Sequence, residues 1–219
     1  VFWPTLGHQF LDWDDDRNLV NNPDFRGLGW SHLRWMLTTT LMGHWIPFTW
    51  LTFGTDYVIW GMRPFGYHLT NLLLHAGAAG ALYFVALRLL RAATGGGEIA
   101  LRLGALAAAL FFAIHPLRVE SVAWATERRD VLSGLWLLLT VLTYLVSVDR
   151  PTRRGRWLAG SLVCYALALT SKAIVMTLPA VLLILDVYPL RRLGRGRAWA
   201  TEEGRQVLIE KIPFVLLAV

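Results

Sequence analysis

The sequence predicts an all-α, polytopic membrane helix bundle, and two observations support this fold class. In composition, 55% of the 219 residues are hydrophobic, only 16% are charged and the mean hydropathy is +0.46. This apolar content exceeds that of a typical soluble domain. The second observation is a series of apolar runs long enough to approach or cross about 30 Å of hydrocarbon. The expected spans are residues 68–90, 100–116, 131–148, 157–170 and 173–188, with a truncated sixth at 212–219.

The chain is expected to be one domain that is incomplete at both ends. Val1 is not an initiator residue, no basic leader precedes the first motif, and the run at 212–219 stops in mid-helix. We divide the domain into a first non-cytoplasmic loop, residues 1–66, and a transmembrane region, residues 67–219.

Residues 1–66 are expected to lie on the membrane surface. They hold seven of the eleven tryptophans, and indole rings prefer the boundary between lipid headgroups and hydrocarbon. Residues 31–41 mix apolar and polar side chains as a short helix in the interface plane does. Residues 21–23 and 27–29 have the composition of turns.

Residues 157–188 are predicted to form two short helices joined at Ser171-Lys172 rather than one long helix. A single helix of about 32 residues would extend roughly 48 Å, well beyond the hydrocarbon core. Two short helices place their junction below the outer membrane surface, with Lys172 in it. A charge at that depth indicates a functional site.

Basic residues predict the orientation, because arginines and lysines in short loops stay in the cytoplasm. They concentrate in alternate loops, at residues 88–102, 150–156 and 191–205. The loops that carry most of the acids therefore face away from the cytoplasm. This topology explains the net charge of +6 without a nucleic-acid partner, and the arginines would attract anionic lipids. The single cysteine, Cys164, leaves no intrachain disulfide.

Asp14, Asp15 and Asp16 form the strongest candidate for chemistry. Three successive carboxylates repel one another, which raises the pKa of at least one and favours a general base near neutral pH. A divalent cation bound there, with Asp16 as a ligand, is a second interpretation. A solvated acidic turn or a helix N-cap is the structural alternative.

The loop at residues 115–130 shares the non-cytoplasmic face with these aspartates. Arg128 or Arg129 is a candidate for gripping an anionic headgroup, since the planar guanidinium suits phosphate. Lys172 is a candidate for the same role as a point charge. The alternative for this loop is a salt-bridged surface helix. Its histidine and the others in the chain lack zinc-ligand spacing.

Several ordered blocks of the sequence resemble one family. They are residues 10–23 (FLDWDDDRNLVNNP), 43–50 (GHWIPFTW), 63–71 (RPFGYHLTN), 115–130 and 171–173. Together they resemble the transmembrane and tetratricopeptide-repeat O-mannosyltransferase-like proteins. That family looks like part of the GT-C superfamily of membrane glycosyltransferases, which take a sugar from a polyprenyl-phosphate carrier and act outside the cytoplasm.

The resemblance implies a fold and roles for particular residues. The fold is a GT-C-like bundle, and Asp14 and Asp15 match the acidic pair that supplies the catalytic base, with Asp14 our first choice. Three residues of the 115–130 loop, Glu120, Arg128 and Asp130, match the second loop's pattern. Lys172 matches a basic position suited to the carrier phosphate, which we expect it to hold together with Arg128 or Arg129.

The resemblance also implies a reaction and a location. A sugar, expected to be mannose, would pass from a polyprenyl-phosphate donor to a hydroxyl of a protein or glycan acceptor. The high arginine and alanine content favours a bacterial inner membrane with a periplasmic active face. The helix before the acidic loop, the later helices and the tetratricopeptide repeats lie outside this sequence, so the segment alone is not expected to be active.

Two other classes of function are compatible with a polytopic chain. A transporter or lipid-handling protein places charges near the membrane midplane, and only Lys172 has that character. A membrane anchor for peptide-binding repeats would leave the aspartates without a role, and neutralising them would change nothing.

Overall fold

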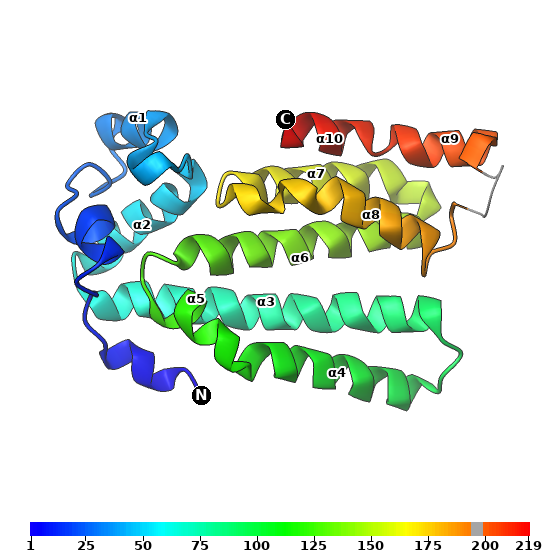
Figure 1. Ribbon diagram of the computed structural model, residues 1–219, viewed down its shortest axis with the longest axis horizontal. Helices are drawn as coiled ribbons and strands as arrows, with labels where there is room; N and C mark the ends of the chain where they lie inside the picture. Colours follow the sequence, from blue (N-terminus) through cyan, green and yellow to red (C-terminus); the bar gives the residue numbers. More distant parts are fainter. Residues whose placement is uncertain (194–198) are drawn as a thin grey trace.

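The computed structural model describes residues 1–193 and 199–219, which fold into helices and turns without a strand. The bundle is built on α3 (Pro64–Ala93), α4 (Glu98–Ile114), α6 (Arg128–Asp149), α7 (Arg154–Leu169) and α8 (Leu178–Val187). Figure 1 shows these helices side by side, with their axes along the length of the molecule. The expected all-α architecture is confirmed.

The remaining helices are short. They are η1 (Trp3–Gly7), η2 (Asp16–Val20), α1 (Trp30–Thr38), η3 (Leu41–Gly43), α2 (Pro47–Trp60), η4 (Pro116–Arg118), α5 (Val119–Ala123), η5 (Pro151–Arg153), η6 (Ala173–Thr177), α9 (Glu202–Ile209) and α10 (Ile212–Ala218). The predicted interfacial helix at 31–41 corresponds to α1. The longer α2 was not expected from the sequence.

Helices form where the apolar runs predict them, but fewer of them have the length of a full span. By length and hydropathy, α3 and α6 qualify to cross a membrane. A third span results if α4 and the segment Pro116–Ala123, which are bent by 54° relative to each other, count as one. The expected helix at 173–188 is a shorter apolar helix, Ala173–Val187.

The break predicted between the last two runs is present. α7 ends at Leu169, and the chain turns before η6 begins at Ala173. Because α7 runs toward this turn and α8 runs away from it, the turn lies at the same end of the bundle as residues 1–63 and the loop before α6 (Figure 1). We call this the acidic end.

Two apolar cores hold the molecule together. The bundle core lies between α3, α6, α7 and α8 and includes Tyr144, Tyr165 and Leu182. A second core at the acidic end joins α1, α2 and the start of α3, around Phe25, Trp50 and others. Residues 1–63 therefore form a packed cap and not an extended loop.

Close packing in this cap requires a glycine in α2. A Cβ atom on Gly54 would come within 2.6 Å of the Met36 Cε atom and 3.1 Å of the Phe25 carbonyl oxygen. Gly54 thus lets α2 approach both α1 and the preceding turn. The cap fixes the position of everything that it contacts at the acidic end.

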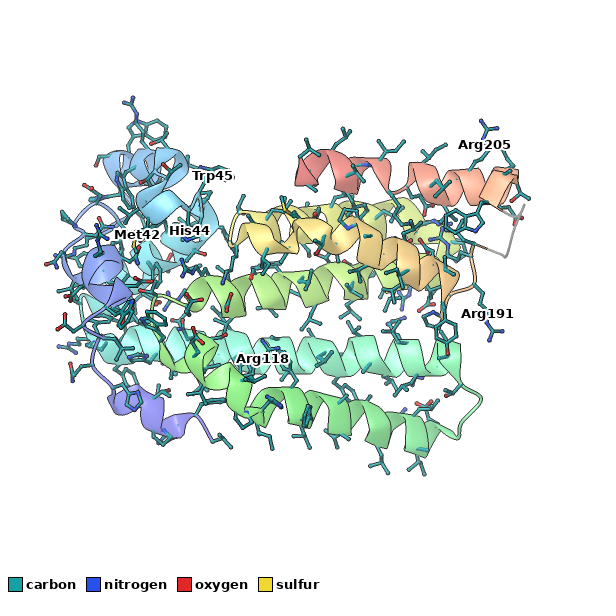
Figure 2. The ribbon with its side chains drawn as sticks, in the orientation of Figure 1. Met42, His44, Trp45, Arg118, Arg191 and Arg205 are labelled. Atoms are coloured by element: carbon teal, nitrogen blue, oxygen red, sulfur yellow. The ribbon has the colours of Figure 1, made fainter. Side chains whose placement is uncertain are left out.

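The opposite end of the bundle, which we call the arginine-rich end, holds the turns around 94–97, 150–153 and 188–193. Figure 2 shows Met42, His44 and Trp45 at the acidic end and Arg191 and Arg205 at the other. The predicted alternation of basic loops therefore agrees with the way the helices run. Arg195 and Arg197 of the third basic loop lie outside the described residues.

A buried set of charges connects the helices at the arginine-rich end. Asp186 forms ion pairs with Arg192 and Lys211, and the Tyr144 hydroxyl donates to the same carboxylate. Glu210 accepts a 2.8 Å hydrogen bond from Arg192. We refer to these five residues as the closed cluster.

Candidate functional site

Asp15 attaches the acidic segment to the loop before α6. Its carboxylate is buried and accepts hydrogen bonds from the Thr126 backbone N–H at 2.9 Å, from the Thr126 hydroxyl, and from the Leu11 N–H at 3.0 Å. Asp15 precedes the helical turn η2, but its side chain makes no capping bond there. The N-cap interpretation therefore does not apply to Asp15, which instead positions two distant segments.

Asp14 and Asp16 differ from Asp15 in their surroundings. The Asp14 side chain is half-buried, and its carboxylate forms no hydrogen bond or ion pair with any residue that the structure describes, while its backbone carbonyl accepts from Asn18 at 2.8 Å. A hydrogen bond with Asp12, followed by desolvation and the charges of Asp12 and Asp15, raises the pKa of Asp16. The raised pKa that the sequence predicts for one of the three aspartates is found at Asp16, but its main cause is the hydrogen bond with Asp12, and repulsion within the triplet, from Asp15, is the smallest.

Lys172 lies between two acids of the loop before α6. Its ammonium forms an ion pair with Asp130 and a longer one, 3.4 Å, with Glu127. Glu127 also binds Arg129, and Asp130 accepts a hydrogen bond from the Ser121 hydroxyl at 3.1 Å. We refer to Ser121, Glu127, Arg129, Asp130 and Lys172 as the open cluster, because Lys172 remains 26% exposed and Asp130 35% exposed.

The turn that carries Lys172 is held by the start of α2. The Phe48 N–H donates to the Thr170 carbonyl oxygen at 3.1 Å, and the Thr49 hydroxyl donates to the Ser171 carbonyl oxygen at 3.1 Å. These bonds satisfy carbonyl groups that the end of α7 leaves without helical partners. The cap therefore determines where the Lys172 ammonium lies.

Arg128 does not have the surroundings expected of a residue that binds a carrier phosphate. Its side chain is fully buried, forms an ion pair with Asp56, and donates to Asn71 and to the Tyr67 carbonyl oxygen at 2.8 Å each. The guanidinium also lies 4.4 Å from the centre of the Phe53 ring. In this arrangement Arg128 joins α2, α3 and α6, and Arg129 is the neighbouring arginine left near the open cluster.

The Glu120 carboxylate is not drawn into either group. Glu120 is exposed in α5, and its side chain has no ion-pair or hydrogen-bond partner within the described ranges. The salt-bridged alternative for the 115–130 loop holds in part, because Arg129 pairs with Glu127 inside the loop. The other cation that pairs with Glu127 is Lys172, which lies in the turn after α7.

A cavity of about 220 Å³ opens beside the open cluster, between α3, α4 and α6. Its polar lining comes from His75, Arg118, Ser121 and Asp130, and its remaining walls are apolar and include Leu82 and Leu137. Arg118 follows the end of α4 and is labelled in Figure 2, and its guanidinium lies 4.5 Å from the centre of the Phe112 ring. The cavity can therefore receive a ligand with a polar group and an apolar chain.

Several of these residues were missed by sequence reasoning. Glu127 and Ser121 were read only as parts of a loop, and Thr126, Asp56 and Asn71 were given no role. Glu127 does precede two arginines in the sequence, which is a signal for pairing, whereas nothing local links Asp56 to Arg128. Among the residues placed by the structure, no three histidine, cysteine or acidic side chains form a metal-binding group, so Asp16 as a cation ligand remains a prediction.

The sequence matches several curated proteins, whereas no family model and no solved structure matches it. It is 30% identical to the protein O-mannosyl-transferase TMTC2 of Mus musculus over 204 residues, which are 88% of this chain and 23% of that protein. It is 39% identical to Tmtc1 of Drosophila melanogaster over 152 residues, 66% of this chain and 16% of that protein. With human TMTC4 the identity is 31% over 192 residues, 80% and 26% of the respective lengths.

The matches cover most of this chain but only a small part of each relative. The chain spans about a quarter or less of the length of these relatives. All three carry the name protein O-mannosyl-transferase. Over most of its own length, this chain is TMTC-like, corresponding to part of the proteins named TMTC protein O-mannosyl-transferases.

Proposed function

We propose that the complete protein is a membrane glycosyltransferase that moves a sugar, mannose, from a polyprenyl-phosphate carrier to an acceptor hydroxyl on the non-cytoplasmic side. One observation carries the proposal. Asp15 binds Thr126, the adjacent Glu127 binds Lys172, and Lys172 binds Asp130, so three segments far apart in sequence meet at the acidic end. The names of the relatives support the reaction class.

In this proposal Asp14 is the general base. Its carboxylate is half-buried and uncommitted to any described partner, whereas the Asp15 carboxylate is occupied by three donors. The Asp14 carboxylate takes the proton of the acceptor hydroxyl as the hydroxyl oxygen attacks the anomeric carbon. The bond from that carbon to the phosphate oxygen breaks, and Asp15 acts as a positioning residue.

The leaving phosphate is already ionised and needs cations rather than a general acid. Lys172 and Arg129 are the partly accessible cations of the open cluster, and Arg118 lines the neighbouring cavity. Fixed positive groups of this kind stabilise charge that develops on the leaving group. The apolar walls around Leu82 and Leu137 suit the first units of the carrier chain.

The proposal also names an acceptor and a location. A protein serine or threonine is the acceptor that the relatives' names suggest, with a glycan hydroxyl as the other candidate. We place the protein in a bacterial inner membrane with the acidic end in the periplasm. Membrane lipid surrounds the apolar faces of α3, α4 and α6.

The test uses the full-length protein in vesicles with polyprenyl-phosphate mannose and an acceptor peptide. Asp14→Asn is expected to lower transfer by about 10² to 10⁴-fold, the usual contribution of a general base, with expression and insertion unchanged. Asp24→Asn is the matched control, because Asp24 is an exposed aspartate of the same cap. Equal transfer by wild type and Asp14→Asn would remove Asp14 from the mechanism.

Two further readouts separate the alternatives. Chelation of divalent cations tests the ligand role predicted for Asp16, because loss of transfer that added Mg²⁺ or Mn²⁺ restores would support it. Movement of the labelled donor across the vesicle membrane without any transfer would favour the lipid-handling class instead.

A further inference from the structure

A second cavity, of about 410 Å³, lies beside the acidic segment and has no part in the scheme above. It is lined by Leu11, Asp12, Trp13 and Trp124. Its volume is within the range of small-molecule sites, roughly 300–1,000 Å³. Two tryptophans, from segments more than a hundred residues apart, therefore line one mostly apolar space, with Asp12 among the lining residues.

Asp15 holds both walls of this cavity. One of its carboxylate oxygens accepts from the Leu11 N–H at 3.0 Å, and the other accepts from the Thr126 N–H at 2.9 Å, two residues beyond Trp124. The Trp13 N–H donates to the Leu11 carbonyl oxygen at 2.8 Å, which closes the turn that carries Trp13. The cavity is thus a built feature of the fold, fixed by a buried side chain.

We infer that this cavity, which we call the tryptophan cleft, binds the hexose ring of the sugar donor, an inference that rests on the function proposed above. The C–H hydrogens on one face of a hexose carry partial positive charge and pack on the negative face of an aromatic ring. The ring hydroxyls can donate hydrogen bonds to the Asp12 carboxylate, which also shares a hydrogen bond with Asp16. A flat apolar wall and an adjacent acceptor together suit a neutral polyol.

The charge around the cleft disfavours other occupants. Asp12, Asp14 and Asp16 lie within four residues of one another, and the pKa of Asp16 is raised by the Asp12 contact. A phosphate would be repelled by these acids and is better placed at Lys172 and Arg118. Neither Lys172 nor Arg118 lines the cleft, so the sugar and the phosphate would occupy different groups of residues.

Exposure of Trp13 gives the inference a sharp test. Trp13 is 74% exposed, and Trp3, which lies in η1 and does not line the cleft, is 75% exposed. Replacing either ring removes little buried surface, so both variants are expected to fold. Trp3→Ala is therefore a matched control for Trp13→Ala, and Trp13→Phe is the conservative variant that keeps an aromatic face.

Binding is measured at equilibrium in the full-length protein carrying Asp14→Asn, so that turnover is removed. Trp13→Ala is expected to weaken binding of polyprenyl-phosphate mannose about tenfold and to leave binding of polyprenyl phosphate within about twofold. Trp13→Phe should retain most of the affinity, and Trp3→Ala should change neither ligand. Equal weakening of the binding of both ligands would overturn the inference, because Trp13 would then act as a membrane anchor. No change in the binding of either ligand would also overturn it.

A second probe separates this inference from the proposed function. Methyl α-mannopyranoside has no carrier. It should give a saturable signal in saturation-transfer difference NMR with the wild-type protein, and Trp13→Ala should abolish that signal. If this sugar binds while no lipid-linked donor is consumed, the cleft stands and the transferase proposal falls. If the donor is consumed equally by wild type and Trp13→Ala, and the free sugar gives no signal, the transferase stands and the cleft falls.

Discussion

The two ends of the bundle both gather charged side chains, but they leave them in different states. In the closed cluster at the arginine-rich end, the Asp186 carboxylate is fully buried, and Arg192 and Lys211 are 12% and 8% exposed. In the open cluster at the acidic end, Lys172 and Asp130 are 26% and 35% exposed beside a cavity. Buried, mutually satisfied charges hold helices together, whereas partly exposed ones keep the capacity to bind a ligand.

The difference is clearest in what each cluster connects. The closed cluster ties α6 to α8 and to the junction of α9 and α10. Its hydrogen bonds and ion pairs connect Tyr144, Asp186, Glu210 and Lys211, with Arg192 between them. The open cluster connects the turn after α7 to the start of α6 and, through Ser121, to α5. If stability depends on the closed cluster and ligand binding on the open cluster, substitutions in the two should have different effects.

The largest effect on stability is expected from Asp186→Asn. This change leaves the Arg192 and Lys211 cations close together without their shared counter-charge, and breaking a buried ion pair costs about 3–5 kcal/mol. Thermal unfolding in detergent measures the loss. Glu202→Gln, at a side chain 93% exposed, should leave unfolding unchanged, and a loss at Asp186 no larger than in that control would contradict the assignment.

Arg128→Met tests the exception at the acidic end. Because Arg128 is fully buried against Asp56, its removal should lower the free energy of unfolding by about 3 kcal/mol. Adding Asp56→Asn to Arg128→Met should recover part of that loss, since the uncompensated carboxylate disappears. A stable Arg128→Met protein that has lost only donor binding would restore Arg128 to the phosphate site.

Lys172→Met should show the opposite pattern. A partly exposed ion pair contributes about 0–1 kcal/mol, so unfolding should change little. Transfer should fall by about 10²-fold, the order expected for loss of one group that stabilises transition-state charge. Lys172→Arg keeps the charge and should retain part of the activity. If Lys172→Met lowered stability as much as Asp186→Asn, the two clusters would not differ in kind.

The smallest effect is expected from Asp12→Asn, which removes the main cause of the raised pKa of Asp16. In the native protein, Asp16 binds its proton more tightly than in the unfolded chain. Its contribution therefore favours the folded state at low pH and is lost as pH rises from the ordinary aspartate pKa through the raised one. Carboxyl NMR titration should show a lower pKa of Asp16 in Asp12→Asn, and an unchanged pKa would assign the shift to burial and the charge of Asp15.

The sequence predicts the helices and which charged residues lie at each end of the bundle. Apolar runs predict the bundle because the pattern of apolar residues can be read within a short window of the sequence. The break at Ser171-Lys172 is predicted from length and from the side on which the following arginines must lie, and α7 does end at Leu169. α2 was missed because its residues read as interfacial, and five expected spans reduce to two or three helices with sufficient length and hydropathy.

Particular contacts of the site could not be predicted in the same way. Asp15 and Thr126 are 111 residues apart, and Lys172 and Asp130 are 42 apart. No periodic pattern records which donors meet across such distances, so Asp14 and Asp15 looked equivalent and Arg128 and Arg129 looked interchangeable. Burial separates each pair: the occupied Asp15 from the free Asp14, and the enclosed Arg128 from the more accessible Arg129.

The bond from Thr126 to Asp15 has a consequence for biogenesis. Translation delivers the acidic segment 111 residues before its partner, a delay of several seconds or more at roughly 5–20 residues per second. Throughout that interval the Asp15 carboxylate lacks its two donors from Thr126. Chaperones or translocation factors that shield this segment would thus act early, before the hairpin that carries Lys172 has been inserted.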